Sequence, residues 1–233
     1  MALILSIDTS TYGCSVAVYD GTKRLACYEL MTEKSSSAML TLLIQNVIFQ
    51  TGYSLSDLDA VAVAKGPGSY TGLRIGVSTA KGLCFALDKP FIGINTLAAM
   101  AVQVQGYFSE SQLLCPMIDA RRMEVYCAVF DKMLQEVLPV EAKIIDAQSF
   151  EMLLEQRQVV FFGDGAAKCQ SVMGASANAF FLPETIFPSA KTIGLLATQA
   201  FENQQFEDLA AFEPFYLKEF MSTVPRKKMG VEG

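Results

Sequence analysis

The chain contains no histidine among its 233 residues. Histidine is the commonest general base near neutral pH and the commonest transition-metal ligand in proteins, so both groups are missing together. Ser-His-Asp and Cys-His nucleophile pairs cannot form within this chain. A mechanism that uses a carboxylate or a lysine stays open, but hydrolytic and metal-dependent catalysis become poor hypotheses. We expect no catalytic residue, no metal site and no cofactor.

The chain is also short of positive charge. Lysine and arginine number 18 against 24 aspartate and glutamate residues, which gives a net charge of −6. A surface of this sign repels phosphate backbones, so binding of nucleic acid by the isolated chain is not expected. Three adjacent basic residues, Arg226-Lys227-Lys228, stand near the C-terminus, where solubility is a better explanation than contact with RNA.

Cys-x-x-Cys pairs are absent, and several cysteines lie inside apolar runs, as expected for buried thiols in a reducing compartment. The six cysteines are Cys14, Cys27, Cys84, Cys115, Cys127 and Cys169. No signal peptide is visible at the start, and the uncharged stretches 35–56 and 90–109 are interrupted by polar residues, glycine or proline. We expect a cytoplasmic protein without membrane spans.

Short apolar strands and helix-like segments alternate along the first part of the chain. Strands are predicted at residues 3–7, 15–19, 23–30, 60–64 and 91–94. Helices are predicted at 35–49, capped by Ser35, Ser36 or Ser37, and at 73–87. Because the second helix lies between two buried strands, it forms a βαβ unit with parallel strands.

The same pattern recurs 111 residues later, where Asp8 matches Asp119 and Tyr19 matches Phe130. Strands are predicted at 113–118, 125–130 and 159–162, and the last leads through Gly163-Asp164-Gly165 into a helix at 166–173. A chance match of short strands is the alternative. The repeat predicts an α/β fold of two related lobes with a cleft between them, each a mixed sheet flanked by helices.

The expected division is a first lobe of residues 1–108, with 205–233 as a candidate completion, and a second lobe of residues 109–204. A helix at 192–206 is expected to return towards the first lobe.

The glycine-rich run from Gly66 to Arg74 follows a predicted strand and opens a predicted helix. Free backbone N–H groups at such a place can bind an anion. No Gly-Lys-Ser/Thr follows, so the spacing is not that of a P-loop. The favoured interpretation is that the glycines permit a sharp turn and close helix packing.

Two aspartates at strand ends could serve a nucleotide. Asp8-Thr9-Ser10 could hold a metal-bound phosphate, although capping of local N–H groups is favoured. Asp119 could be a second phosphate-side carboxylate, although an ion pair with Arg121 or Arg122 is favoured. The residues of a candidate vestigial nucleotide site are Asp8, Thr9, Gly66, Gly68, Asp119 and Gly163.

The two repeated lobes resemble the superfamily of actin, Hsp70 and hexokinase (the ASKHA fold). A closer resemblance is to the TsaB (YeaZ) family, carried by residues 6–10, 66–74, 92–97 and 117–122, with a further family-like motif at 214–218. Many family members have a histidine near Ser35 and a proline near Thr41, and this chain departs from both.

The resemblance implies a non-catalytic subunit for bacterial synthesis of N6-threonylcarbamoyladenosine at tRNA position 37. It implies binding to a TsaD-like catalytic subunit and to a TsaE-like ATPase, with tRNA reached only through the complex, and self-association when the chain is alone. TsaD carries a metal held partly by a histidine pair. The matching positions here are Thr96 and Met100, which suit a helix cap and a core filler.

Apolar residues spread around most of the helix at 35–49, which is broader than the stripe of a helix packed on one side. A helix buried in one deep core is the alternative. The resemblance favours an interface with TsaD through the first-lobe helices. The contact residues predicted are Met39, Leu43, Val47, Val77, Ala80 and Lys81.

Two rival functions remain. One is an actin-like ATPase or kinase that uses Asp8 and the glycine turns. The other is a glycoprotease, an older label of the wider M22 family, which the missing histidine disfavours.

Overall fold

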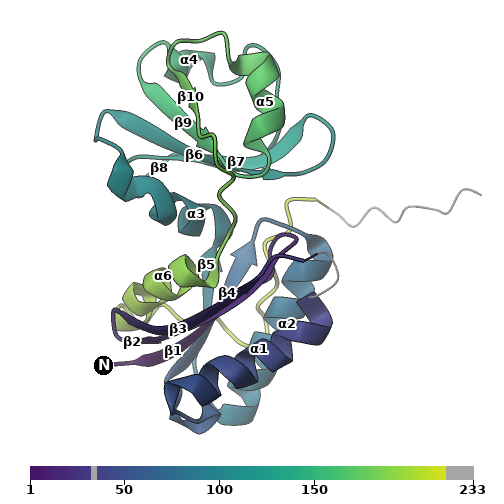
Figure 1. The fold of residues 1–233 in the computed structure, drawn as a ribbon, viewed down its shortest axis with the longest axis vertical. Coiled ribbons are helices and arrows are strands. Elements are labelled where there is room, and N and C mark those ends of the chain that lie inside the picture. The colour runs from purple at the N-terminus through teal and green to yellow at the C-terminus, as the bar shows by residue number, and fades with distance from the viewer. Residues whose placement is uncertain (33–35, 219–233) are drawn as a thin grey trace, which may run out of the picture.

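The computed structural model describes residues 1–32 and 36–218, and it shows two α/β lobes, one above the other in Figure 1. Each lobe is built on a five-stranded sheet. The first sheet has the order β3-β2-β1-β4-β5, with β1 (Leu3–Asp8), β2 (Cys14–Asp20), β3 (Lys23–Leu30), β4 (Ala60–Gly66) and β5 (Phe91–Asn95). The second has the order β10-β9-β6-β7-β8, with β6 (Gln112–Asp119), β7 (Glu124–Phe130), β8 (Glu136–Ile144), β9 (Gln158–Phe162) and β10 (Ala179–Phe181).

The two sheets have the same topology. In the first, the central strand β1 pairs antiparallel with β2 and parallel with β4. In the second, β6 pairs antiparallel with β7 and parallel with β9. The prediction of two related lobes, each with a mixed sheet, is therefore confirmed. The repeated aspartates end equivalent strands, since Asp8 closes β1 and Asp119 closes β6.

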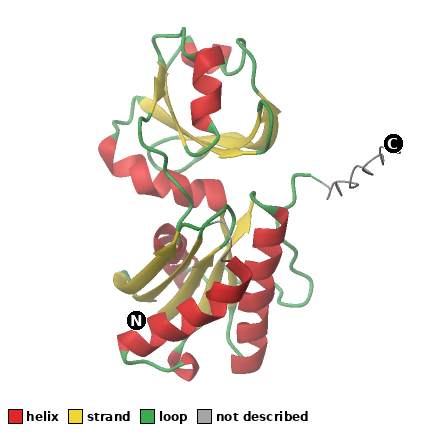
Figure 2. Ribbon diagram, turned by 45° about the vertical axis from the view of Figure 1, so that its right-hand side comes forward, coloured by secondary structure: helices red, strands yellow, loops and turns green. Residues whose placement is uncertain are grey.

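Helices cover both faces of the first sheet. Alternate residues of β1, β2 and β4 pack against α1 (Ser36–Thr51) and α2 (Tyr70–Leu87), which lie side by side on one face (Figures 1 and 2). The intervening residues of β1, β4 and β5 pack against α6 (Ala190–Glu202) on the other face. Both faces of the first sheet are thus buried, which explains why the sequences of these strands are continuous apolar runs.

The second sheet is layered in the same way. One face packs against α4 (Glu151–Leu154) and α5 (Ala166–Met173), and the other against α3 (Thr96–Val104). Short 3₁₀ turns follow α1 and α3, at Leu55–Asp57 and Gln105–Tyr107. Helices α3 and α6 also contact each other, so they form the layer between the two sheets.

Capping side chains set the helix starts, which differ slightly from the predicted ones. Helix α2 begins at Tyr70 and not at residue 73, because the Ser69 hydroxyl accepts a hydrogen bond from the Gly72 N–H. Helix α3 is capped by Asn95, whose side chain accepts from the Ala98 N–H at 3.0 Å. Thr96 is therefore the first helical residue and not the cap. The predicted cap Ser35 lies outside the described residues.

The segment after residue 189 returns to the first lobe. Helix α6 packs on β1, β2, β4 and β5, so the predicted return of a helix at 192–206 towards the first lobe is confirmed. The contacts of α6 with the first sheet form because the chain crosses back from the second lobe before residue 190.

Residues 205–218, here called the strap, run along the free edge of the first sheet. The Glu207 N–H donates to the Phe91 oxygen at 2.9 Å, and the Phe215 N–H donates to the Lys65 oxygen at 2.7 Å. The Phe212 ring meets the Phe91 ring edge-on, with centroids 4.8 Å apart. The strap therefore covers an edge that would otherwise expose unpaired backbone groups.

Among the helices described, none has the length and apolar composition that a membrane crossing requires.

Candidate functional site

Asp8 lies at the end of β1 and is buried. One carboxylate oxygen, Oδ1, accepts from the Ser10 N–H at 2.8 Å and from the Ser10 hydroxyl at 2.9 Å. The other oxygen, Oδ2, has no hydrogen-bond partner within the described residues. Burial raises the pKa of Asp8 to about 6, against the lowering effect of the Ser10 hydrogen bonds. Local capping thus accounts for one oxygen and leaves the other unsatisfied.

The glycine-rich turn after β4, from Gly66 to Gly72, packs directly against the backbone of Thr9 and Ser10. A Cβ atom at Gly68 would lie 2.2 Å from the Ser10 oxygen, and one at Gly72 would lie 2.0 Å from the Thr9 oxygen. The Ser69 N–H donates to the Ser10 oxygen at 2.6 Å, and the Thr9 hydroxyl donates to the Gly72 oxygen at 2.7 Å. Close packing between the β1–β2 turn and the start of α2 explains these glycines. An open phosphate cradle does not fit this turn.

Gly66 has a separate reason to be glycine. Its φ is +110°, and a Cβ atom would lie 2.8 Å from the Phe215 oxygen of the strap. The turn therefore joins three segments that are far apart in sequence: β1, α2 and the strap.

Asp119 at the end of β6 has different surroundings. Its Oδ1 forms an ion pair with Lys168 of α5 and accepts from the Arg121 N–H at 2.8 Å. The predicted pairing with the side chain of Arg121 or Arg122 is wrong, because the structure records the ion pair of Asp119 with Lys168. Both arginines lie in a tight turn with positive φ, and their side chains are exposed.

Gly163 repeats the close packing of the first lobe. Its φ is +106°, and a Cβ atom would lie 2.2 Å from the Met117 oxygen. The neighbouring Asp164 accepts from the Asp119 N–H at 3.0 Å, and burial raises its pKa. The candidate nucleotide residues therefore gather at equivalent ends of the two sheets, where packing and local hydrogen bonds already engage most of their groups.

Thr96 and Met100 are both fully buried at the junction of the lobes. Met100 belongs to the core of the second lobe, as a core-filling role requires. The Thr96 hydroxyl has no hydrogen-bond partner among the described residues. Within residues 1–32 and 36–218, no group of three or more Cys, Asp or Glu side chains is arranged to hold a metal ion.

Three of the six predicted interface residues are not accessible. Val47, Val77 and Ala80 are buried in the first-lobe core, between the helices and the sheet. Met39 and Leu43 are partly buried, and Leu43 packs against the same core. Apolar character alone therefore does not tell which residues of α1 and α2 point outward.

Lys81 is held by the strap, where its ammonium group donates to the Phe212 oxygen at 3.0 Å and faces the Ala210 oxygen at 3.4 Å.

Three other apolar side chains of the two helices are exposed. Leu42 is 45% exposed, Phe49 is 76% exposed and Phe85 is 83% exposed. Leu42 and Phe49 are seven residues apart and so lie on one side of α1. We call these three residues the α1–α2 face. Large exposed aromatic and aliphatic groups on neighbouring helices are typical of a surface that binds another protein.

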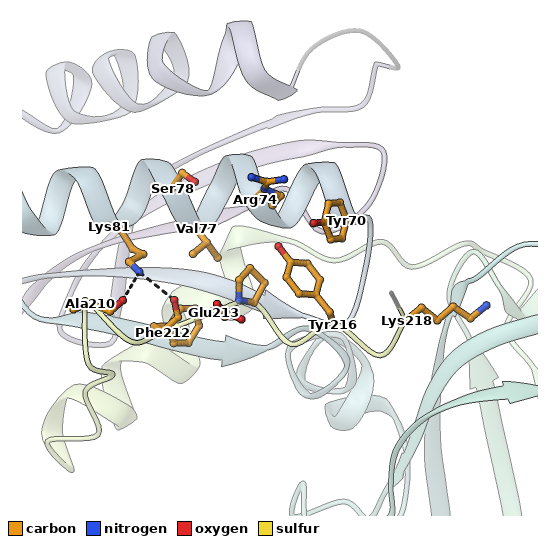
Figure 3. Close-up of a pocket in the computed structure, with 11 residues that line it drawn as sticks. Tyr70, Arg74, Val77, Ser78, Lys81, Ala210, Phe212, Glu213, Tyr216 and Lys218 are labelled. Carbon is orange, nitrogen blue, oxygen red and sulfur yellow. Dashed lines mark hydrogen bonds between the residues drawn. The ribbon is translucent and has the colours of Figure 1, made fainter. Parts of the chain in front are cut away.

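A groove of about 700 Å³ runs between α2 and the strap (Figure 3). The Tyr70 and Tyr216 rings pack against each other at one end of it, with centroids 4.7 Å apart, and the Arg74 guanidinium lies 5.6 Å from the Tyr70 ring centroid. Sequence reasoning missed this groove, although Arg74 and the segment 214–218 were both in recognised motifs. Its lining residues are Tyr70, Arg74, Val77, Ser78, Lys81, Ala210, Phe212, Glu213, Pro214, Tyr216 and Lys218.

Comparison of the sequence with protein families gives a match over residues 30–224 to the model described as TsaD: tRNA N6-adenosine threonylcarbamoyltransferase. The tRNA threonylcarbamoyladenosine biosynthesis protein TsaB of Bacillus subtilis is 34% identical over 164 residues, which cover 69% of this chain and 70% of that protein. The TsaB protein of Escherichia coli is 40% identical over 130 residues, 55% of either chain. This second match thus spans about half the length of the E. coli relative.

Solved structures show the same fold. The structure of YeaZ from Pseudomonas aeruginosa superposes with a TM-score of 0.80 and 23% identity, covering 93% of this chain and all of that one. An activator of 2-hydroxyisocaproyl-CoA dehydratase from Clostridium difficile, with bound ADPNP, superposes with a TM-score of 0.50 and 12% identity over 88% of this chain and 96% of that one. The two-lobed architecture is that of the actin-like ATPase fold.

Proposed function

The chain belongs to the TsaB (YeaZ) family, which is related to the TsaD threonylcarbamoyltransferases, and from this we propose that it is a non-catalytic subunit in bacterial biosynthesis of N6-threonylcarbamoyladenosine at tRNA position 37. It binds and supports a TsaD-like catalytic subunit, together with a TsaE-like ATPase. Its contribution is positional: it stabilises the partner's active arrangement by binding that arrangement preferentially.

The observation that carries the proposal is the α1–α2 face. Phe49 and Phe85 expose most of their surface, although the lobe beneath them is well packed. Burial of two such rings stabilises an association by several kcal/mol, at roughly 25 cal/mol per Å² of apolar surface. The catalytic subunit is the natural occupant, because a related fold offers equivalent helices to pair with these. In its absence a second copy of this chain occupies the same face and forms a homodimer.

A non-catalytic role is supported by the chemistry at the lobe junction. Thr96 and Met100 stand where the related transferases carry a metal-binding histidine pair, and neither side chain can replace an imidazole ligand. The chain therefore acts through its partner, in the cytoplasm, and tRNA is reached only through the complex.

The test is a double substitution, Leu42→Asp with Phe85→Asp. Both side chains are exposed, so the monomer stays folded by circular dichroism while the heterodimer with the TsaD-like subunit of the same organism disappears in size-exclusion chromatography. Homodimerisation is lost as well. Met152→Asp is the matched control, since Met152 is 79% exposed on α4 of the second lobe.

An intact heterodimer in the double variant would rule out this face as the interface. Val47→Asp is unsuitable for the purpose, because a charge at a fully buried position unfolds the lobe itself. A tRNA modification assay with the purified subunits, with and without this chain, then measures whether the complex needs it.

One observation favours a second candidate, an actin-like ATPase or kinase. The Asp8 Oδ2 atom is buried without a described partner at the end of the central strand, where a metal-bound phosphate could satisfy it. Titration calorimetry of the isolated chain with ATP and Mg²⁺ separates the two functions. Micromolar binding with turnover that is lost in Asp8→Asn would establish the enzyme and displace the scaffold.

A further inference from the structure

The groove between α2 and the strap is elongated. Its α2 wall runs from Tyr70 to Lys81, eleven residues along the helix, which is about 16 Å at a rise of about 1.5 Å per residue. An extended chain covers that distance in about five residues at roughly 3.3 Å each. The strap forms the facing wall and touches α2 at both ends, where Tyr70 packs on Tyr216 and Lys81 donates to the Phe212 oxygen. A helix does not fit between these walls, whereas a short extended peptide can lie along their rim.

Three cations and one acid line the groove, and two of the cations are engaged by other described residues. Lys81 is engaged by the carbonyl oxygens of Ala210 and Phe212, and Lys218 is paired with Glu124 of β7. Within the described residues, the structure records no ion pair for Arg74. The groove thus presents a guanidinium with no ion-pair partner in residues 1–32 and 36–218, on a chain whose net charge is −6.

Arg74 is also oriented. Its guanidinium lies over the Tyr70 ring, which in turn packs against Tyr216 (Figure 3). This stacking reduces the side-chain entropy that binding would otherwise remove. Arginine and tyrosine held in this way are the residue types that contribute most to protein interfaces.

The groove continues the α1–α2 face. Phe85 is eleven residues after Arg74 on α2, a spacing that turns the helix through about three full turns and places the two side chains on one side. A partner that covers Phe85 therefore has Arg74 about 16 Å further along the same stripe.

Resting on the proposed partner role, we infer that the α2–strap groove receives an extended acidic segment of the same protein partner, and that Arg74 binds a carboxylate of that segment in a bidentate pair. A nucleic-acid strand suits the groove less well. Neutralising a phosphate backbone needs several free cations, whereas two of the three here are already engaged and Glu213 adds a negative charge.

The test measures the affinity of this chain for the TsaD-like subunit at low and high salt, with Arg74→Glu, Arg74→Gln and Arg74→Lys. The glutamate variant binds about 10- to 100-fold more weakly and loses most of the salt dependence, the glutamine variant binds about tenfold more weakly, and the lysine variant lies between glutamine and wild type. Lys23→Glu, an exposed charge reversal on β3, is the matched control and changes the affinity less than twofold. Circular dichroism checks that each variant is folded.

Charge reversal of single acidic residues in the partner identifies the counterpart, since one reversal restores the affinity of Arg74→Glu. If Arg74→Glu binds like wild type while Leu42→Asp with Phe85→Asp does not, the groove inference fails and the proposed function stands. If both variants bind like wild type, the α1–α2 face is ruled out as the interface as well, whereas the proposed function itself fails if the wild-type chain does not bind the TsaD-like subunit or if tRNA modification does not need it. Binding of a short RNA by the isolated chain, weakened by Arg74→Glu without any effect on the partner, would overturn the inference in favour of RNA.

Discussion

The two lobes share one topology but differ at the aspartate that ends each central strand. Asp8 of the first lobe is buried, and one of its oxygens has no described partner. Asp119 of the second lobe is 48% exposed and paired with Lys168. Each lobe nevertheless has a glycine packed against a backbone oxygen, Gly72 against that of Thr9 and Gly163 against that of Met117. The two lobes therefore share close packing around a glycine, while the electrostatic surroundings of the carboxylate differ.

The largest effect is expected from the glycines. Gly72→Ala and Gly163→Ala each force a Cβ atom to within about 2.2 Å of a backbone oxygen, so each lowers the free energy of unfolding by at least about 3 kcal/mol in urea denaturation. Gly82→Ala on the same helix as Gly72 is the control. It meets open space and stabilises α2 by roughly 0.5–1 kcal/mol. A neutral Gly163→Ala would show that the packing similarity of the two lobes is only apparent.

Asp8→Asn tests the electrostatic difference. The pKa of Asp8 rises on folding from 3.8 to about 6, so the folded state binds this proton more tightly than the unfolded state. The resulting stability is fully present below pH 3.8 and is lost as the pH rises through about 6. Since each pKa unit corresponds to about 1.4 kcal/mol, the ionised carboxylate costs about 3 kcal/mol at pH 7.

Asp8→Asn should therefore remove the downward slope of unfolding free energy between about pH 4 and 6 and raise stability at pH 7. Denaturation series at several pH values measure this. An unchanged slope would mean that Asp8 is hydrated or paired in solution.

Asp119→Asn should do much less. Its partner Lys168 is partly exposed and the pair is open to solvent, so the loss is below about 1 kcal/mol and shrinks as salt is added. Lys168→Met serves as the reciprocal variant. A loss above about 1 kcal/mol, or a gain in stability at pH 7 like that expected for Asp8→Asn, would contradict the difference between the two carboxylates.

The smallest effect concerns thiol reactivity and leaves stability unchanged. Cys27 of the first lobe is partly exposed, whereas Cys115, Cys127 and Cys169 of the second are buried. Burial raises the pKa of Cys27 to about 11, so it reacts slowly at pH 8. Cys27 is nevertheless the first to be alkylated, as peptide mass spectrometry of the native protein can show. Earlier modification of Cys115 would indicate that the second lobe opens more often than the first.

The fold could be predicted because the strands are short apolar runs bounded by turn residues, and because the same order of elements occurs twice. Val61 and Ala62 point to opposite faces of β4, and both are apolar because helices cover both faces. Helix starts were less predictable, since the choice between Asn95 and Thr96 as cap depends on backbone geometry.

The site could be predicted only in part. The motifs identified Asp8 and the glycine turns, but the partner of Asp119 is Lys168, which is 49 residues away and reached only through the fold. The exposed residues of α1 and α2 could not be distinguished from the buried ones, because Leu42 and Val47 look equally apolar in sequence. The groove depends on the strap, whose position cannot be inferred from its own composition.

The strap and α6 also determine the order in which the two lobes can fold during synthesis. The first sheet receives β1 from the beginning of the chain, yet its second face and its edge are covered by residues beyond 189. During synthesis, β1 to β5 emerge first and wait with an uncovered apolar face until the whole second lobe has been translated. The second lobe, by contrast, is nearly continuous in sequence and can fold as soon as β10 appears. Contacts between distant parts of a chain slow folding, and until they form, apolar surface that favours aggregation stays exposed. Newly made first lobes should therefore be the part of this protein that most needs a chaperone.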